Sequence, residues 1–482
     1  MSNATRALWR PVGILLAAAF PLSAAAVSDA DIRELREQVR QMKQEYEQRI
    51  LQLEARLAEA ERSASAAAGT AGKAEAAAAQ AEMSASEARE TAQQTARRPA
   101  AENTFNPAIS LILSGTYTNL SSDPATYRID GFVPSLGEIA PPPRSFSLGE
   151  SELTLSASVD PYFRGVFTAA ITPENEVEVE EAYVRTLALP YGSGIKAGRF
   201  FSGVGYLNEQ HPHMWDFTDA PLPYKAFFGN QLADDGVQLT WVAPTELFLQ
   251  FGVEGARFLT FPGTDAERNK NGLMSGAGFV KLGGDLGASN SWQAGLSYVQ
   301  TKPRDRADSE DDPGFAFSGT SRTAIADFVW KWAPEGNARE RSLKLQGEYF
   351  RRRENGTLVA FAPSEACGGE CSGDYSSRQS GWYLQGVYQF LPAWRAGLRY
   401  DRLDYGSVVI GVVDAGQVAP EDLAILQPHD PSRWTAMIDW NPSEFSRIRL
   451  QYARDRARLG ETDNQLWLQY IMSLGAHGAH KF

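Results

Sequence analysis

The chain has 482 residues and a formal charge of −13 at pH 7. Hydrophobic residues make up 43% of the chain, and aromatic residues make up 11%. An acidic balance argues against binding to nucleic acid, which is recognised by basic surfaces. Beyond the N-terminal segment, no stretch approaches the 18 or more apolar residues of a membrane helix, so an exported form either stays in the periplasm or enters a membrane as a β-barrel.

Residues 1–26 are typical of a secretory signal peptide. Arg6 and Arg10 precede the apolar run PVGILLAAAFPLSAAA, and a small-residue cleavage site ends at Ala26. This order of a positive start, an apolar run and an Ala-x-Ala site indicates export. We therefore expect the remaining chain to lie outside the cytoplasm.

Residues 27–62 predict an α-helical coiled coil. Apolar residues from Ile32 to Ala60 recur at intervals of three and four, with one stutter, which is typical of a heptad seam. One amphipathic helix cannot bury such a seam alone, so we expect self-association. Residues 63–105 are rich in Ala, Gly, Ser and Glu, which predicts a thin helical stalk or a flexible linker.

Residues 106–482 predict an all-β transmembrane barrel of about 16 antiparallel strands, because apolar residues alternate with polar ones in segment after segment. An even number returns the C-terminus to the side where the first strand begins, as in single-chain bacterial barrels. The sixteen candidate strands begin near Ile109, Leu148, Phe163, Val177, Ile195, Asp235, Leu247, Gly276, Ser291, Arg322, Ser342, Gly381, Trp394, Arg433, Ser446 and Gln465.

The connections between these strands alternate in length. Short turns such as SVDPYF, LPYGSG and FLPAW alternate with links of about 25 to 30 residues around 121–147, 202–234, 352–378 and 404–432. Short periplasmic turns and long outer loops characterise outer-membrane barrels. A large soluble β protein is the alternative, and it would not need aromatic residues at two levels.

The aromatic residues do fall at two levels, which predicts two membrane-interface girdles. One set adjoins the short turns and the other lies near the long loops. The first comprises Trp241, Trp292, Trp330, Trp332, Phe390, Trp394 and Trp440, and the second Tyr298, Tyr349, Trp382, Tyr400, Trp434 and Tyr452.

Two further features fit an exported barrel. Cys367 and Cys371 in ACGGEC are close enough to form a small disulfide ring in an oxidising compartment, and a metal pair is less favoured because no histidine lies nearby. The last strand leads to Phe482, in the place where bacterial barrels carry an aromatic insertion signal.

The strand parity also predicts which charged side chains face the lumen. Nine cationic and eight acidic residues share the inward parity, so a salt-bridged wall is favoured slightly over a dedicated anion track. The candidate pore-lining residues are Arg164, Arg185, Lys331, Lys344, Arg395, Arg399, Asp401, Asp439, Arg447 and Arg449; the other inward charges are Lys281, Glu152, Glu181, Glu254, Asp327, Glu348 and Asp455.

The run VEVEEAYVRTLALPYGSGIKAGRFFSGVGYLNEQ, followed by LADDGVQLTW, resembles the phosphate-selective porin O/P family. Its members pair an E-A-(Y/F)-V strand with a G-R-F strand before a long third loop. The resemblance implies a homotrimeric porin of the outer membrane of a Gram-negative bacterium. It also implies that the third long loop, about residues 202–234, folds inward as a constriction.

These features predict a non-enzymatic porin for passive diffusion of small solutes, including anionic ones, and no cofactor. No G-x-S-x-G elbow or Ser/His/Asp spacing suggests an enzyme. The alternative is a structural tether, in which the barrel anchors a periplasmic coiled coil that reaches peptidoglycan or a periplasmic protein. The expected partners are thus outer-membrane lipid, further copies of the chain and small solutes, but not nucleic acid.

Four of the five histidines form two close pairs, His211/His213 and His477/His480, and paired imidazoles invite a metal hypothesis. Two nitrogens leave a zinc site half built, although Glu209 and Asp216 offer oxygens near the first pair. The aromatic and proline-rich segment HPHMWDFTDAPLPY explains the same residues as a structural loop. We favour that loop and keep His211 and His213 as weak metal candidates.

Overall fold

The computed structural model describes residues 107–475, apart from 134–138, 173–175, 258–260, 264–270, 274, 310–312 and 362–366, together with the isolated residues Glu37 and Arg40. The predicted signal peptide, coiled coil and stalk lie outside the described residues, as do His477, His480 and Phe482. Within the described part, no helix is both long and apolar enough to cross a membrane.

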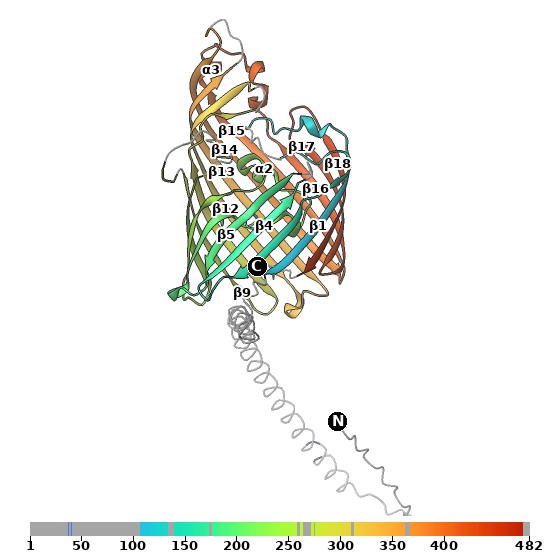
Figure 1. Cartoon of the computed structure of the whole chain (residues 1–482). Helices are drawn as coiled ribbons and strands as arrows, with labels where there is room; N and C mark the ends of the chain where they lie inside the picture. Colours follow the sequence, from blue (N-terminus) through green and yellow to red (C-terminus); the bar gives the residue numbers. More distant parts are fainter. Residues whose placement is uncertain are drawn as a thin grey trace, which may run out of the picture. The chain divides into compact units, whose positions relative to one another are not determined.

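Sixteen antiparallel strands close into a barrel in the described part of the chain (Figure 1). Each strand pairs with its neighbour in sequence, and β18 pairs with β1 to close the wall. The strands are β1 (Ala108–Leu120), β3 (Ser151–Ser158), β4 (Phe163–Ile171), β5 (Val177–Thr186), β6 (Ser193–Phe201), β7 (Ala233–Val242), β8 (Phe248–Ala256), β9 (Ser275–Leu286), β10 (Asn290–Thr301), β12 (Phe315–Trp332), β13 (Ser342–Ala360), β14 (Cys371–Leu391), β15 (Trp394–Ile410), β16 (Ser432–Ser443), β17 (Ser446–Arg456) and β18 (Asp463–Gly475).

Short elements join this wall without adding to its circumference. The strand β2 (Ser145–Leu148) pairs with β1, and β11 (Arg306–Ala307) pairs with β12. The helices in the described residues from 107 onward are η1 (Pro124–Thr126), η2 (Pro190–Gly192), η3 (Pro212–Met214), α2 (Leu222–Phe228), η4 (Pro334–Gly336), α3 (Gly411–Asp414) and η5 (Pro420–Leu426). The prediction of a sixteen-stranded antiparallel barrel is confirmed.

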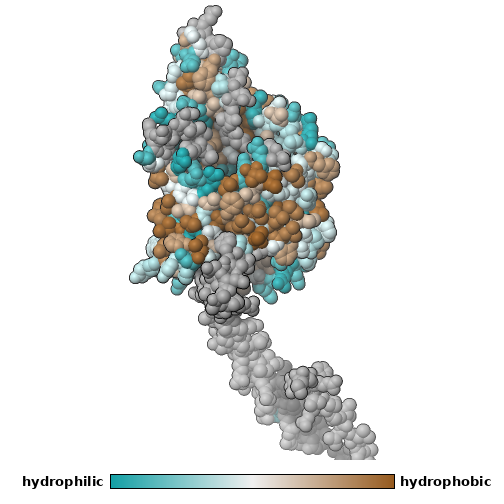
Figure 2. All heavy atoms as spheres, viewed as in Figure 1, coloured by the Kyte–Doolittle hydropathy of each residue, from teal (hydrophilic) through white to brown (hydrophobic). Residues whose placement is uncertain are grey.

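The two parities of each strand face different surroundings, because successive side chains point to opposite faces of a sheet. In β18, Leu466, Leu468 and Tyr470 are exposed on the outer face, whereas Gln465 and Trp467 of the other parity are buried inside. On the face in view, Figure 2 shows a brown apolar belt across the wall, with more hydrophilic surface above and below it. An apolar belt between polar rims is the surface of a lipid-embedded barrel.

Aromatic side chains mark both borders of this belt. Beside the short turns, Trp394 lies opposite Trp440, with ring centroids 6.3 Å apart. Six residues further along the same strands, Tyr400 lies opposite Trp434, with ring centroids 4.5 Å apart. The two predicted levels are thus cross-strand rows on neighbouring strands.

Four strands are longer than the sequence pattern indicates. The strands β12 and β14 begin at Phe315 and Cys371 rather than near Arg322 and Gly381, so much of the expected loop 352–378 is a paired hairpin. The difference has a physical reason: beyond the membrane both faces of a strand meet water or loops, and apolar alternation fades while the backbone hydrogen bonds continue. Figure 1 shows these strands rising beyond the rest of the wall, near α3.

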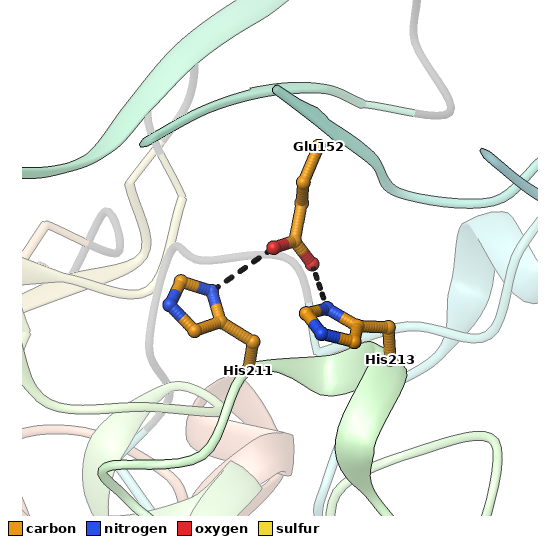
Figure 3. A group of neighbouring side chains, drawn as sticks. All are labelled: Glu152, His211 and His213. Atoms are coloured by element: carbon orange, nitrogen blue, oxygen red, sulfur yellow. Dashed lines mark hydrogen bonds and ion pairs between the residues drawn. The ribbon is translucent and has the colours of Figure 1, made fainter. Parts of the chain in front are cut away.

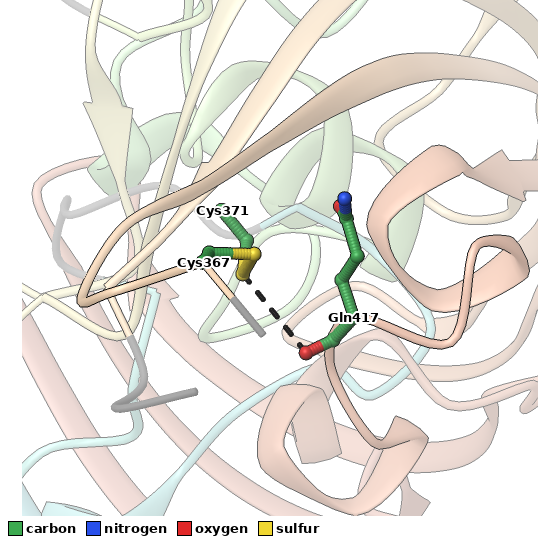
Figure 4. The surroundings of a disulfide bond; sticks show 3 residues. All are labelled: Cys367, Cys371 and Gln417. Carbon is green, nitrogen blue, oxygen red and sulfur yellow. Dashed lines mark hydrogen bonds between the residues drawn. A yellow bond between two sulfur atoms is a disulfide. The ribbon is translucent and has the colours of Figure 1, made fainter. Parts of the chain in front are cut away.

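A separate hydrophobic cluster, here called the outer cluster, supports this extension. It packs loop 411–431 against the long strands, and it comprises Val133, Phe315, Phe317, Leu358, Ala360, Cys371, Tyr375, Val412, Val418, Leu423 and Leu426. Cys367 and Cys371 form a disulfide at the hairpin tip, with Cα atoms 5.4 Å apart. The Cys371 sulfur lies 3.9 Å from the carbonyl oxygen of Gln417 (Figure 4).

Candidate functional site in the barrel lumen

Residues 202–232, here called the lumen loop, fold into the barrel between β6 and β7. The loop contains η3 and α2, and Figure 1 shows α2 enclosed by the barrel wall. All seven residues of α2 are buried. Gly229 ends the helix with φ of 63°, a left-handed conformation that glycine adopts without the steric cost of a Cβ atom.

Aromatic packing holds α2 against the inner wall. The Tyr224 ring meets Phe350 of β13 edge to face, with centroids 5.0 Å apart. Phe227 and Phe228 also contact the Phe350 ring, and Arg352 stacks its guanidinium 4.8 Å from the Phe227 centroid. Inside a mostly polar lumen, α2 thus packs on an apolar patch of the wall.

Glu348 of β13 fastens the start of the loop. Its carboxylate accepts hydrogen bonds from the backbone N–H groups of Tyr206 and Leu207 at 3.1 and 3.0 Å. It also accepts from the hydroxyls of Tyr224 and Tyr383 at 2.9 and 2.6 Å. Four donors on one fully enclosed carboxylate satisfy it well, which is required of a buried charge.

Asp219 fastens the middle of the loop to two strands. Its carboxylate binds Arg399 of β15 at 3.0 Å, pairs with Arg433 of β16, and lies 3.4 Å from the Lys225 ammonium. Burial alone would raise the pKa of Asp219, but these three cations hold it well below its usual value. The group therefore stays ionised and links the loop to the wall.

Asp216 makes a second link nearer the short turns. It binds Lys344 of β13 at 2.9 Å and Arg395 of β15 at 3.3 Å. Burial alone would raise the pKa of Asp216, but the two cations lower it far below its usual value. Arg395 also pairs with Asp439, which binds Arg449 at 2.8 Å, so loop and wall share one charge network.

The candidate pore-lining residues fall into separate groups. Lys344, Arg395, Asp439, Arg447 and Arg449 come together around the loop, where Arg447 and Arg449 donate to the Trp215 carbonyl oxygen at 3.2 and 3.0 Å. Lys331 lies opposite Lys344.

The other candidates lie apart from this group. Arg164 and Arg185 are direct cross-strand partners on β4 and β5. Arg399 and Asp401 form their own contact of 3.2 Å, and Arg399 is almost fully buried against Asp219.

Five of the candidate cations also differ in the exposed fraction of their side chains. The side chains of Lys344, Arg395 and Arg447 are 22%, 21% and 21% exposed, whereas those of Arg399 and Arg449 are 1% exposed. Lys344, Arg395 and Arg447 thus keep solvent contact. The other two act as supports for the loop.

The histidines of the loop face carboxylates of the wall. His211 Nδ1 lies 3.1 Å from both Glu152 Oε2 and Glu180 Oε2, and His211 Nε2 lies 3.0 Å from Glu181 Oε2. His213 Nδ1 lies 2.7 Å from Glu152 Oε1 (Figure 3). Burial alone would lower the pKa of His211, but the carboxylates raise it well above its usual value.

The carboxylates beside these histidines are not the ones that the sequence offered, which were Glu209 and Asp216. Glu209 binds Lys281 at 3.1 Å and Asp216 binds Lys344, so both are engaged elsewhere. Sequence reasoning placed Glu152 inside the lumen but gave it no histidine partner. It also missed Asp219 and Arg433 as anchors, because their contact joins residues 214 positions apart in the chain.

Comparison with known proteins gives one relative in sequence and several barrels in structure. The chain is 34% identical over 411 residues to an uncharacterized protein of Aquifex aeolicus, covering 80% of this chain and 81% of that protein. No family model matches the chain, and the resemblance to the phosphate-selective porin O/P family is not confirmed.

The similar solved structures include an outer-membrane channel and a porin. The channel DcaP of Acinetobacter baumannii has 12% sequence identity and a TM-score of 0.48, covering 78% of this chain and 100% of that one. An anion-selective porin from Comamonas acidovorans has 10% identity and a TM-score of 0.46, covering 77% and 99%.

Proposed function

The chain belongs to the same family as the uncharacterized Aquifex aeolicus protein, a relationship that assigns no activity. From the side chains that line the lumen, we propose that the protein is an outer-membrane channel for passive diffusion of small solutes and that it favours anions. The apolar belt and the two aromatic levels support a position in a bilayer. The inward-folded loop narrows the lumen that such solutes would cross.

One observation carries the preference for anions: cationic side chains gather inside the barrel close to the short turns. They share the lumen parity and lie within three residues of the strand ends that these turns connect. This cationic row consists of Arg164, Arg185, Lys196, Lys331, Lys344, Arg395 and Arg447.

Strand register makes the row nearly continuous in two places. Arg185 lies opposite both Arg164 and Lys196, and Lys331 lies opposite Lys344. Like charges directly opposite repel one another, so such an arrangement favours an anion between them. Charge-assisted hydrogen bonds from arginine and lysine are well suited to that role.

Internal pairing limits how specific the channel is. Asp216 and Asp439 already occupy part of the binding capacity of Lys344, Arg395 and Arg449. We therefore propose a general anion preference rather than the phosphate selectivity of the family that the sequence resembles. Lys344 and Arg447 are the first residues to test because their side chains keep solvent contact.

The test is a measurement of conductance and reversal potential for the purified protein in a planar bilayer under a salt gradient. We expect ion conduction with an anion-favouring reversal potential, and a shift toward cations in the Lys344→Gln/Arg447→Gln variant. Arg402→Gln is the matched control, since Arg402 lies outside the lumen and pairs with Asp430 while 42% exposed. An unchanged reversal potential in the double variant would remove these side chains from the conducting path.

Absence of conductance in the folded wild-type protein would contradict a channel and favour the alternative of a barrel that anchors a periplasmic tether. We also propose a homotrimer, held by barrel walls and by the predicted coiled coil at residues 27–62. A monomeric mass for the intact protein in mild detergent would contradict that assembly.

A further inference from the structure

The contact between the lumen loop and β3 has the composition of a metal site. One ligand atom each from Glu152, His211 and His213 lies within 4.8 Å of the others. The two imidazoles face the same carboxylate (Figure 3), and their rings are stacked with centroids 5.7 Å apart. Imidazole nitrogen and carboxylate oxygen are the ligands that zinc and related divalent metals accept together.

A further carboxylate oxygen lies beside His211, outside this group of three. Glu180 Oε2 lies 3.1 Å from His211 Nδ1, the same nitrogen that contacts Glu152. In a tetrahedral zinc site with bonds of about 2.0 Å, ligand atoms lie about 3.3 Å apart. The present separations of 2.7 to 3.1 Å between neighbouring nitrogen and oxygen atoms are close to that spacing.

An independent observation concerns the far side of the His211 ring. Its Nε2 lies 3.0 Å from Glu181 Oε2, so both ring nitrogens face carboxylates. Histidines that bind metals commonly donate the N–H of the second nitrogen to a carboxylate, which fixes the ring and increases the basicity of the binding nitrogen. Glu181 is in place for that supporting role.

The local charge also favours a cation. Besides Glu152, Glu180 and Glu181, the carboxyl group of Glu150 hydrogen-bonds to Glu180. Four carboxyl groups therefore lie around two imidazoles, and such acidic surroundings attract a cation.

We propose that Glu152, His211 and His213 form a binding site for a zinc-class divalent metal ion, with Glu180 beside His211 as a further oxygen and Glu181 as the positioning residue of His211. The site joins the lumen loop to β3 and β5, on strands separate from the Asp216 and Asp219 links. A bound ion would thus fasten the loop on a further side. This proposal replaces our preference for a purely structural role of the two histidines, and it does not depend on conduction.

The test is a calorimetric titration of the folded, full-length protein in detergent with Zn²⁺, followed by Co²⁺ spectroscopy. We expect one equivalent of Zn²⁺ to bind in the submicromolar range, with affinity reduced at least a hundredfold in His211→Ala and in His213→Ala. Glu181→Gln should weaken binding about 10- to 100-fold, the range for residues that orient a metal ligand. Co²⁺ should give the visible absorption of a four-coordinate nitrogen and oxygen site in the wild type, and this absorption should be absent in His211→Ala and in His213→Ala.

Two control variants separate this site from other histidines. His429→Ala removes an imidazole whose Nε2 contacts the Arg456 carbonyl oxygen at 2.9 Å, and His477→Ala/His480→Ala removes the C-terminal pair. Both should bind Zn²⁺ as the wild type does. Loss of binding in the C-terminal variant, or equal affinity in all folded variants, would overturn the proposal, as would a wild type that binds no Zn²⁺. Far-ultraviolet circular dichroism verifies that each variant is folded.

Discussion

Asp219 offers the sharpest test of how the lumen loop is held. Replacing Asp219 with Ala removes the loop carboxylate that pairs with the buried Arg399 and Arg433 and with Lys225; Arg399 keeps its hydrogen bond to the backbone oxygen of residue 219 on the loop. Breaking a buried ion pair by removing one member costs about 3 to 5 kcal/mol. A cost of that size raises the equilibrium population of the unseated loop roughly a hundredfold to a few thousandfold, at about 1.4 kcal/mol for each factor of ten.

Hydrogen exchange of the loop amides, measured by mass spectrometry on the detergent-solubilised barrel, reports this population. We expect peptides that contain α2 to exchange faster by that factor in Asp219→Ala, while the strands keep their protection. Asp430→Ala is the matched control, because its pair with Arg402 is 42% and 47% exposed and such surface pairs contribute about 1 kcal/mol or less. Unchanged exchange of the loop in Asp219→Ala would refute the assigned role of this aspartate.

Three further predictions concern pH, the disulfide and one glycine. Because the folded pKa values of Asp216 and Asp219 lie well below the usual value, their stabilisation is fully present above about pH 3.9 and is lost only as pH falls through the lower folded values. The ratio of loop exchange between Asp219→Ala and the wild type should therefore stay constant from about pH 7 to about pH 4. Cys367→Ser/Cys371→Ser should lower the stability of the hairpin tip by roughly 2 kcal/mol, seen as faster local proteolysis with an intact barrel. Gly198→Val should reduce the yield of folded barrel, because φ is 129° there and an added Cβ would lie 2.2 Å from the Ala182 carbonyl oxygen; a normal yield would contradict this.

The wall of the barrel is largely encoded in local alternation, which explains how far the sequence predicts it. Each strand meets lipid on one side and the lumen on the other, so a period of two appears wherever both surroundings are present. The pattern weakens beyond the membrane, and the expected starts near Arg322 and Gly381 were therefore too late.

The candidate site is much less local than the wall. Parity places Arg395, Arg399 and Asp439 inside, but it cannot tell which loop carboxylate each arginine meets. Nor does it show that Glu152 of β3 lies beside His211 and His213 of the loop, since these contacts form only after the chain has closed on itself. The disulfide was accessible to sequence reasoning because its two cysteines are four positions apart.

The anchors of the lumen loop also constrain the order of folding. Asp219 contacts Arg433 across 214 positions, and the Thr218 N–H donates to Gln451 across 233 positions. Closing a chain segment of that length costs conformational entropy, and the contacts offset this cost only once they have formed. We therefore expect the lumen loop to fold into the barrel late, after β13, β15, β16 and β17 have formed. A loop bound in this position would then indicate that the barrel around it is fully folded.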